Sequence, residues 1–191
     1  MKQISYTDLK QQQVVDTRSQ ADYQQGHLKH SLNLNIGNFK TYALNFLVLD
    51  QPLVFVTGSD SEADELYEIA KEHGFTDVEG YLSIEAVSAE NLEQTALISA
   101  EEFLKTEGDF ILLDVRHPDE ITRKAPERNL VNIPLESLAD SIEQLDSTKK
   151  VYTLCGSGNR GTTASSFLAG NGFQTIVIAG GMKAVEAIQN K

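Results

Sequence analysis

The residues best suited to chemistry are a cysteine and an arginine that close the two ends of one glycine-rich turn. Cys155 is the only cysteine of the chain, and four residues separate it from Arg160. A thiolate is a nucleophile that a helix N-terminus and a nearby arginine stabilise. An arginine side chain is a permanently charged, planar group that binds oxyanions. Although a lone cysteine is usually a small buried hydrophobe, this context predicts a nucleophilic centre that acts on an anion.

The turn between these two residues predicts an anion-binding cup. It follows an apolar run at 151–154 that suits a strand and precedes a segment at 161–171 that suits a helix. Glycines in the turn adopt backbone angles forbidden to other residues, so successive amide groups can point into one concavity, at the positive end of the helix. The candidate binding residues are Gly156, Ser157, Gly158, Asn159 and Gly161. The serine and the asparagine are also common turn residues that need no further role.

Composition limits the partners that we expect. The chain has 191 residues and a net charge of −12, which argues against nucleic acid and anionic membrane as ligands. One cysteine excludes an intramolecular disulfide, and a free reactive thiol fits a reducing compartment. The N-terminus lacks the apolar core of a signal peptide, and polar residues interrupt the longest apolar region, 43–56. We therefore expect a cytoplasmic protein.

An internal repeat divides the chain into two copies of one unit. VVDTR at 14–18 matches LLDVR at 112–116, VFVTGS at 54–59 matches YTLCGS at 152–157, and HGF at 73–75 matches NGF at 171–173. All three pairs lie 98 residues apart. We therefore expect two domains, residues 1–92 and 93–191, with a polar linker around 89–95.

Each copy alternates strands with helices, which predicts an α/β fold with a small parallel sheet and helices on both of its faces. The expected strands are 13–16, 53–57, 76–79, 110–114, 151–154 and 175–178. The expected helices are 21–25, 61–73, 161–171 and 182–189. Ligands bind at the carboxyl ends of strands in such sheets, and Cys155 stands at one of these ends.

Over nearly its whole length the chain resembles a tandem-domain rhodanese, of the thiosulfate/mercaptopyruvate-type sulfurtransferase family. The motifs that carry the resemblance are Asp114-Val115-Arg116, the Cys155–Arg160 loop, Ala179-Gly180-Gly181-Met182, Asp16-Thr17-Arg18 and Gly26-His27-Leu28. Rhodanese loops have four residues between the cysteine and the arginine, as here, whereas related dual-specificity phosphatases have five. The resemblance thus favours sulfur over phosphate as the group held.

The resemblance implies covalent catalysis without a metal or an organic cofactor. The Cys155 thiolate would take a sulfane sulfur from a small anionic donor, and the resulting persulfide would pass it to a thiol, a protein or cyanide. The loop amides of residues 156–161 would stabilise the persulfide, and Arg160 would orient the donor. The Cys-Gly-Ser-Gly run resembles the loops of mercaptopyruvate enzymes, while the arginine resembles those of thiosulfate or persulfide users, so the donor stays open.

The first copy has lost these features. Thr57 stands in place of Cys155, and Glu62 stands in place of Arg160, with Asp60 two residues before it. A threonine hydroxyl forms no persulfide, and carboxylates repel an anion. We expect an inactive domain, which either shapes the active site or a docking surface, or serves packing and stability.

Other residues leave two interpretations each. Asp114 and Arg116 either orient the loop or form a structural ion pair, and the ion pair is favoured. His117 suits the start of a helix better than acid–base catalysis. A solvated charged face is favoured over a basic rim for three cationic residues, Arg123, Lys124 and Arg128.

Two other function classes remain open beside a sulfurtransferase. A phosphatase or arsenate reductase would use the same thiolate and arginine, although the loop length argues against it. A non-catalytic binding or regulatory module would need no nucleophile, although the intact loop of the second copy argues against that role.

Overall fold

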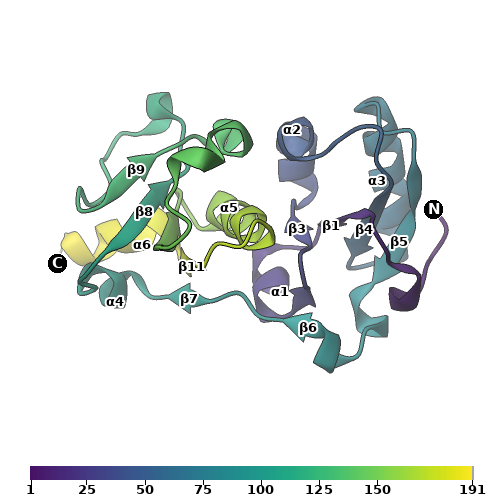
Figure 1. Ribbon diagram of the computed structural model, residues 1–191, viewed down its shortest axis with the longest axis horizontal. Helices are drawn as coiled ribbons and strands as arrows, with labels where there is room; N and C mark the ends of the chain where they lie inside the picture. The colour runs from purple at the N-terminus through teal and green to yellow at the C-terminus, as the bar shows by residue number, and fades with distance from the viewer. Residues whose placement is uncertain (191) are drawn as a thin grey trace. The chain divides into compact units, whose positions relative to one another are not determined.

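The computed structural model describes residues 1–190 and divides into two compact units, Met1–Gln94 and Thr95–Lys191 (Figure 1). The division lies two residues beyond the expected one. The reason is a short antiparallel pair in the first unit, in which β6 (Leu92–Glu93) pairs with β2 (His27–Leu28). Part of the expected linker is therefore a strand of the first unit.

The first unit is built on a four-stranded sheet in the order β3-β1-β4-β5. All its strand pairs are parallel. The strands are β1 (Gln13–Asp16), β3 (Leu32–Asn33), β4 (Leu53–Thr57) and β5 (Val78–Ser83). The helices are α1 (Gln20–Gln25), α2 (Ile36–Phe46) and α3 (Asp60–Glu72). Strand β4 is buried along its whole length, as its unbroken apolar run predicts.

The second unit is built on a five-stranded sheet in the order β7-β11-β10-β8-β9, again with parallel pairs throughout. The strands are β7 (Leu97–Ile98), β8 (Phe110–Asp114), β9 (Leu130–Asn132), β10 (Lys150–Leu154) and β11 (Thr175–Ile178). The helices are α4 (Ala100–Leu104), α5 (Asn159–Gly170) and α6 (Gly181–Gln189).

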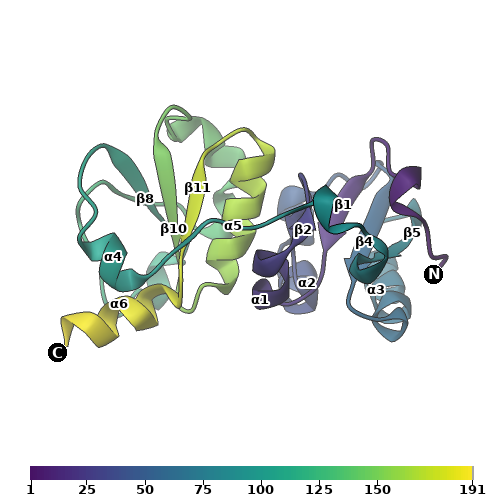
Figure 2. The same ribbon diagram turned by 90° about the horizontal axis from the view of Figure 1, so that it is seen from below.

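Helices cover both faces of the second sheet, as Figure 2 shows with α5 on one side and α4 and α6 on the other. One core holds Phe103 of α4, Phe110 of β8 and Tyr152 of β10, whose rings lie 5.2–5.9 Å apart. Met182 and Val185 of α6 pack into the same cluster. The α/β fold with two similar domains is therefore confirmed.

The differences from the expected elements are local. Helix α5 begins at Asn159, two residues earlier than expected, and the strand expected at 76–79 is β5, which runs over Val78–Ser83. Gly80 lies inside β5 with φ +156°, and the register with β4 shifts there, which obscures the strand in the sequence. Helices α2 and α4 were not expected. Within residues 1–190, no helix combines the length and the apolar character needed to cross a bilayer.

Candidate active site

Cys155 follows the last residue of β10 and lies at the carboxyl end of the sheet, as expected. Its side chain is almost fully buried, with 1% of the residue exposed. The backbone amides of Gly158 and Gly161 donate hydrogen bonds to Sγ, with N···S distances of 3.1 and 3.3 Å. Gly158 has φ +100°, a left-handed conformation that turns its amide toward the sulfur. The turn thus directs two amide donors at the nucleophile.

The other three predicted binding residues between Cys155 and Arg160, namely Gly156, Ser157 and Asn159, lie in different environments. The carbonyl of Gly156 accepts a hydrogen bond from the amide of Lys183, at 3.1 Å. Ser157 is exposed at the tip of the turn, and Asn159 is the first residue of α5. The helix N-terminus therefore begins directly after the cup, where its dipole favours negative charge on the sulfur.

The start of α6 supports the loop from behind. The Met182 amide donates to the carbonyl of Cys155 at 2.8 Å. Gly181 has φ +58°, and a Cβ atom built on it would lie 2.4 Å from the Cys155 carbonyl oxygen and 2.9 Å from the Ser157 and Gly158 amide nitrogens. Only glycine fits this position, so the Ala-Gly-Gly-Met motif lets the start of α6 pack directly against the backbone of the cysteine loop.

Asp114 and Arg116 form the expected ion pair at the end of β8. Their side chains are buried, and the Arg116 guanidinium donates from Nε and Nη2 to the carboxylate at 2.7–3.1 Å. These hydrogen bonds raise the pKa of Arg116 above its ordinary value, against the opposing effect of burial. The Asn132 side chain donates to the backbone carbonyls of both residues, at 2.8 and 2.9 Å. The pair and the asparagine fix the turn beside the cysteine loop.

Arg160 meets a carboxylate of its own unit. Its two Nη atoms donate to the two oxygens of Glu120, which ends the short 3-10 helix Pro118–Glu120. The Nη2–Oε2 distance is 2.9 Å. This hydrogen bonding lowers the pKa of Glu120 below its ordinary value of 4.5. The sequence predicts a role for Arg160 in orienting the sulfur donor and gives no indication that Glu120 is its partner.

His117 lies at the start of this short helix. Its Nδ1 atom accepts a hydrogen bond from the Asp119 amide at 3.3 Å, and the Glu120 carboxylate accepts one from the His117 amide at 2.7 Å. These two bonds form a capping box, which agrees with the favoured capping role.

The three cations 123, 124 and 128 do not gather at the cup. Arg123 donates to the side chains of Asn190 and Gln189 at the end of α6. The Arg128 guanidinium lies 5.1 Å from the ring centroid of Phe110, at the amino end of β8 and therefore at the opposite end of the sheet from Cys155. The basic rim weighed in the sequence analysis is therefore wrong for these two arginines, and Lys124 is exposed.

The first unit repeats the scaffold of this site without its nucleophile. Arg18 pairs with Asp16 as Arg116 pairs with Asp114, and Asn33 donates to the carbonyls of both Asp16 and Arg18. In place of the cysteine, Thr57 is buried and its hydroxyl donates to the Ser59 carbonyl at 3.1 Å. The structural repeat thus extends to individual hydrogen bonds.

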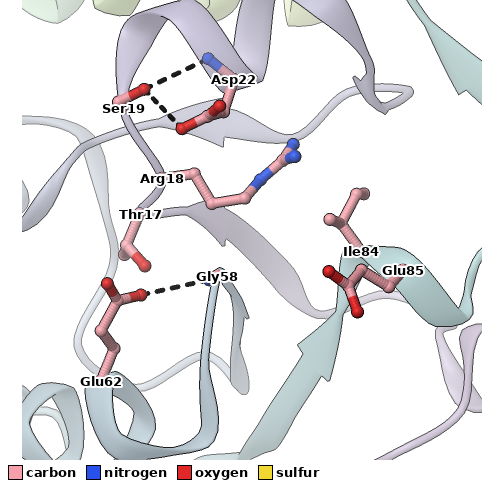
Figure 3. Close-up of a pocket in the computed structure, with 8 residues that line it drawn as sticks. All are labelled: Thr17, Arg18, Ser19, Asp22, Gly58, Glu62, Ile84 and Glu85. Carbon is pink, nitrogen blue, oxygen red and sulfur yellow. Dashed lines mark hydrogen bonds between the residues drawn. The ribbon is translucent and has the colours of Figure 1, made fainter.

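A carboxylate occupies the loop of the first unit. Glu62 Oε2 accepts a hydrogen bond from the Gly58 amide at 3.1 Å. Figure 3 shows this pair beside Arg18, in a pocket of about 410 Å³. The other lining residues are Thr17, Ser19, Asp22, Ile84 and Glu85. The acidic side chains disfavour an anionic ligand, in line with the expected loss of anion binding.

A family model decides where the chain belongs. The model described as "Rhodanese-like domain" matches twice, over residues 4–83 and 99–188. The chain belongs to the rhodanese family. The Bacillus subtilis (strain 168) protein named "Putative sulfurtransferase YtwF" is 27% identical over 96 residues, which cover 50% of this chain and 91% of that protein.

Two solved structures are similar to this rhodanese. A rhodanese-related protein from Thermoplasma volcanium shares 28% identity with a TM-score of 0.46, over 49% of this chain and 92% of that one. The thiosulfate sulfurtransferase from Pseudomonas aeruginosa shares 17% identity with a TM-score of 0.40, over 92% of this chain and 39% of that one.

Three residues of this rhodanese site are not predicted, or only partly predicted, from the sequence. Glu120 and Asn132 were not identified, and Gly181 was noted only as part of a motif. Glu120 matches the acidic Asp22 at the same 98-residue spacing, but Asp22 bonds Ser19 and the first unit has Glu62 in place of Arg160, so the repeat does not indicate the Arg160–Glu120 pair. The contacts of Asn132 and Gly181 depend on the packing of distant elements, which the spacing does not encode.

Proposed function

We propose that this rhodanese is a sulfurtransferase in which Cys155 carries the transferred sulfur as a persulfide. The observation that supports this most directly is the pair of amide hydrogen bonds from Gly158 and Gly161 to Cys155 Sγ. Hydrogen bonds to an ionised acceptor are stronger than those to a neutral one, so these amides are placed to bind the negative charge of a thiolate or a persulfide. A thiolate at the base of an amide-lined cup is suited to attack a terminal sulfur atom.

The first half-reaction moves one sulfur atom to the enzyme. The Cys155 thiolate attacks the outer sulfur of thiosulfate, a new S–S bond forms, and the original S–S bond breaks with its electron pair leaving on sulfite. A persulfide donor reacts in the same way, with its own thiolate as the leaving group. With mercaptopyruvate the Cys155 thiolate attacks the thiol sulfur, the C–S bond breaks, and its electron pair leaves on the enolate of pyruvate, which takes up a proton. The product is a Cys155 persulfide anion, whose negative charge lies near the amides that bind Sγ.

The second half-reaction regenerates the thiolate. A nucleophilic acceptor, either a cellular thiol, a protein or cyanide in an assay, attacks the outer sulfur of the persulfide and leaves with it. Neither step needs a metal or an organic cofactor, because the sulfur atoms carry the electrons that move. The first unit takes no covalent part, since Thr57 has no sulfur.

The same proposal assigns the partners and the compartment. The donor is a small anion with a sulfane sulfur, and the net charge of −12 disfavours nucleic acids and anionic membranes as partners. The Cys155 thiol is free, and a free reactive thiol needs a compartment in which thiols stay reduced, so we place the protein in the cytoplasm.

The test is thiocyanate formation from cyanide with thiosulfate, mercaptopyruvate and a low-molecular-weight persulfide as donors. We expect activity with at least one donor, and its complete loss in Cys155→Ser. Thr57→Val is the matched control at the equivalent position of the first unit, and it should keep the activity. Hydrolysis of an aryl phosphate or reduction of arsenate without sulfur transfer would replace the proposal with the second function class. A folded protein inactive in all three assays would indicate a binding module.

A further inference from the structure

Two arginines lie near the nucleophile of the second unit, and each is paired with a carboxylate. Arg116 is held by Asp114, and Arg160 is held by Glu120. Each guanidinium donates two or more hydrogen bonds to its partner, so each pair is close to neutral as a whole. Neither guanidinium therefore offers an uncompensated positive charge to a sulfur donor, whereas the loop amides and the N-terminus of α5 do offer partial positive charge.

Of the two ion pairs, the partly exposed Arg160–Glu120 pair is the one that an incoming sulfur donor can reach. Its geometry is bidentate, with both oxygens of Glu120 engaged, and the side chains retain exposures of 21% for Arg160 and 40% for Glu120. The Asp114–Arg116 pair is in contrast buried, with exposures of 2% and 6%. A ligand at the mouth of the cup thus meets a guanidinium whose charge a carboxylate already compensates.

We infer that Glu120 determines donor specificity, by neutralising Arg160 so that the site favours sulfane-sulfur donors with one negative charge over the thiosulfate dianion. This inference rests on the proposed sulfurtransferase function. The favoured class comprises persulfides and thiosulfonates that carry a single negative charge.

The physical reason is the second negative charge of the dianion. A singly charged donor places its charge on the sulfur that enters the cup, where the amides of Gly158 and Gly161 lie. The second charge of thiosulfate is spread over its outer oxygens and lacks an uncompensated arginine to bind it. To gain Arg160, thiosulfate must displace Glu120 and leave that carboxylate beside another anion.

The test compares two donors that differ by one charge. Thiosulfate and methanethiosulfonate share the same sulfane–sulfonyl bond, and a methyl group in the second replaces an anionic oxygen. Attack by Cys155 releases sulfite from the first and methanesulfinate from the second. We measure kcat/KM for both donors with cyanide as the acceptor, in the wild type, in Glu120→Gln and in Glu107→Gln.

We expect Glu120→Gln to raise the thiosulfate-to-methanethiosulfonate ratio of kcat/KM about tenfold, the effect of one charge–charge interaction at a partly exposed site. Glu107→Gln removes the same charge from an exposed residue before the amino end of β8, away from Cys155, and should leave the ratio unchanged. An unchanged ratio in Glu120→Gln, or an equal change in the control, would overturn the inference.

A binding measurement covers the case in which Glu120→Gln does not fold. Sulfate and methanesulfonate are unreactive analogues with the same difference of one charge. We expect the wild type to bind them within about threefold of each other by calorimetry, and binding of sulfate more than about tenfold tighter would overturn the inference. This result is independent of turnover.

The two proposals fail in distinguishable ways. If the wild type transfers no sulfur from any donor, the proposed function fails, whereas transfer with an unchanged ratio of kcat/KM in Glu120→Gln refutes the role of Glu120 alone.

Discussion

Replacing Gly181 with alanine should strongly lower the proposed sulfur transfer, although Gly181 lies at the start of α6 and not in the cysteine loop itself. The added Cβ would lie 2.4 Å from the Cys155 carbonyl oxygen, whereas ordinary contacts begin at 3.4 Å, so the loop or the start of α6 must move by about 1 Å. We expect the loop to move, because the added Cβ presses on its Cys155 carbonyl and on its Ser157 and Gly158 amides together. A shift of this size displaces the amides from Sγ.

The expected effect on activity follows from that displacement. A misplacement of about 1 Å in catalytic geometry lowers rate by about 100-fold, and we expect this loss in kcat/KM for sulfur transfer. Stability should fall as well, because a residue with a side chain pays about 1–2 kcal/mol for a left-handed conformation such as φ +58°.

A matched glycine separates the two effects. Gly172 has φ +86°, and a Cβ atom on it would meet nothing within 4 Å. Gly172→Ala therefore carries the conformational cost without the steric one, and should lose about 1–2 kcal/mol in urea unfolding but keep its activity. If the two variants lose activity equally, or if Gly181→Ala stays fully active, then α6 does not position the loop as argued.

Three further predictions concern single side chains. Asn132→Ala removes two hydrogen bonds to backbone carbonyls and should lower the free energy of unfolding by about 1–2 kcal/mol in urea titrations; an unchanged midpoint would contradict its role. Thr57→Cys in a Cys155→Ala background should gain no cyanide-labile sulfur by mass spectrometry, because a carboxylate already holds the adjacent amide, and a gain would show that the first unit keeps a working cup. Pairing with Arg160 lowers the pKa of Glu120, so its contribution to stability is present above the ordinary value of 4.5 and is lost as the pH falls through the lowered pKa. Between about pH 5 and pH 3, wild-type stability should therefore fall more steeply than that of Glu120→Gln, and parallel curves would exclude this contribution.

The sequence predicts those parts of the fold that local pattern controls. Strands β4, β8 and β10 are buried apolar runs, and each was placed within one residue of its bounds. Helix α2 was missed because its buried residues are the polar Asn38 together with Phe39 and Ala43, which are too few apolar residues for a clear period. The pairing of β2 with β6 joins two-residue strands from distant parts of the chain, which no local pattern indicates.

The candidate site likewise has residues that the local sequence predicts and residues whose partners depend on tertiary packing. Cys155 and its glycine turn could be placed from the sequence, because a strand, a turn and a helix lie next to each other in the chain. The partner of Arg160 could not, since Glu120 lies 40 residues away and reaches it only through the arrangement of β8 and β10. The basic rim, the less favoured of the two interpretations, does not form for a similar reason, because the side chains of Arg123 and Arg128 have partners in α6 and β8.

Whether Cys155 carries sulfur is tested most directly by the intact mass of the protein. The protein is incubated separately with thiosulfate, mercaptopyruvate and a low-molecular-weight persulfide, and its mass is recorded before and after the addition of cyanide. We predict a gain of one sulfur atom with at least one donor, its absence in Cys155→Ala and its removal by cyanide. A wild-type protein that gains no sulfur from any donor, while Cys155 stays reduced and open to alkylation, would contradict the account.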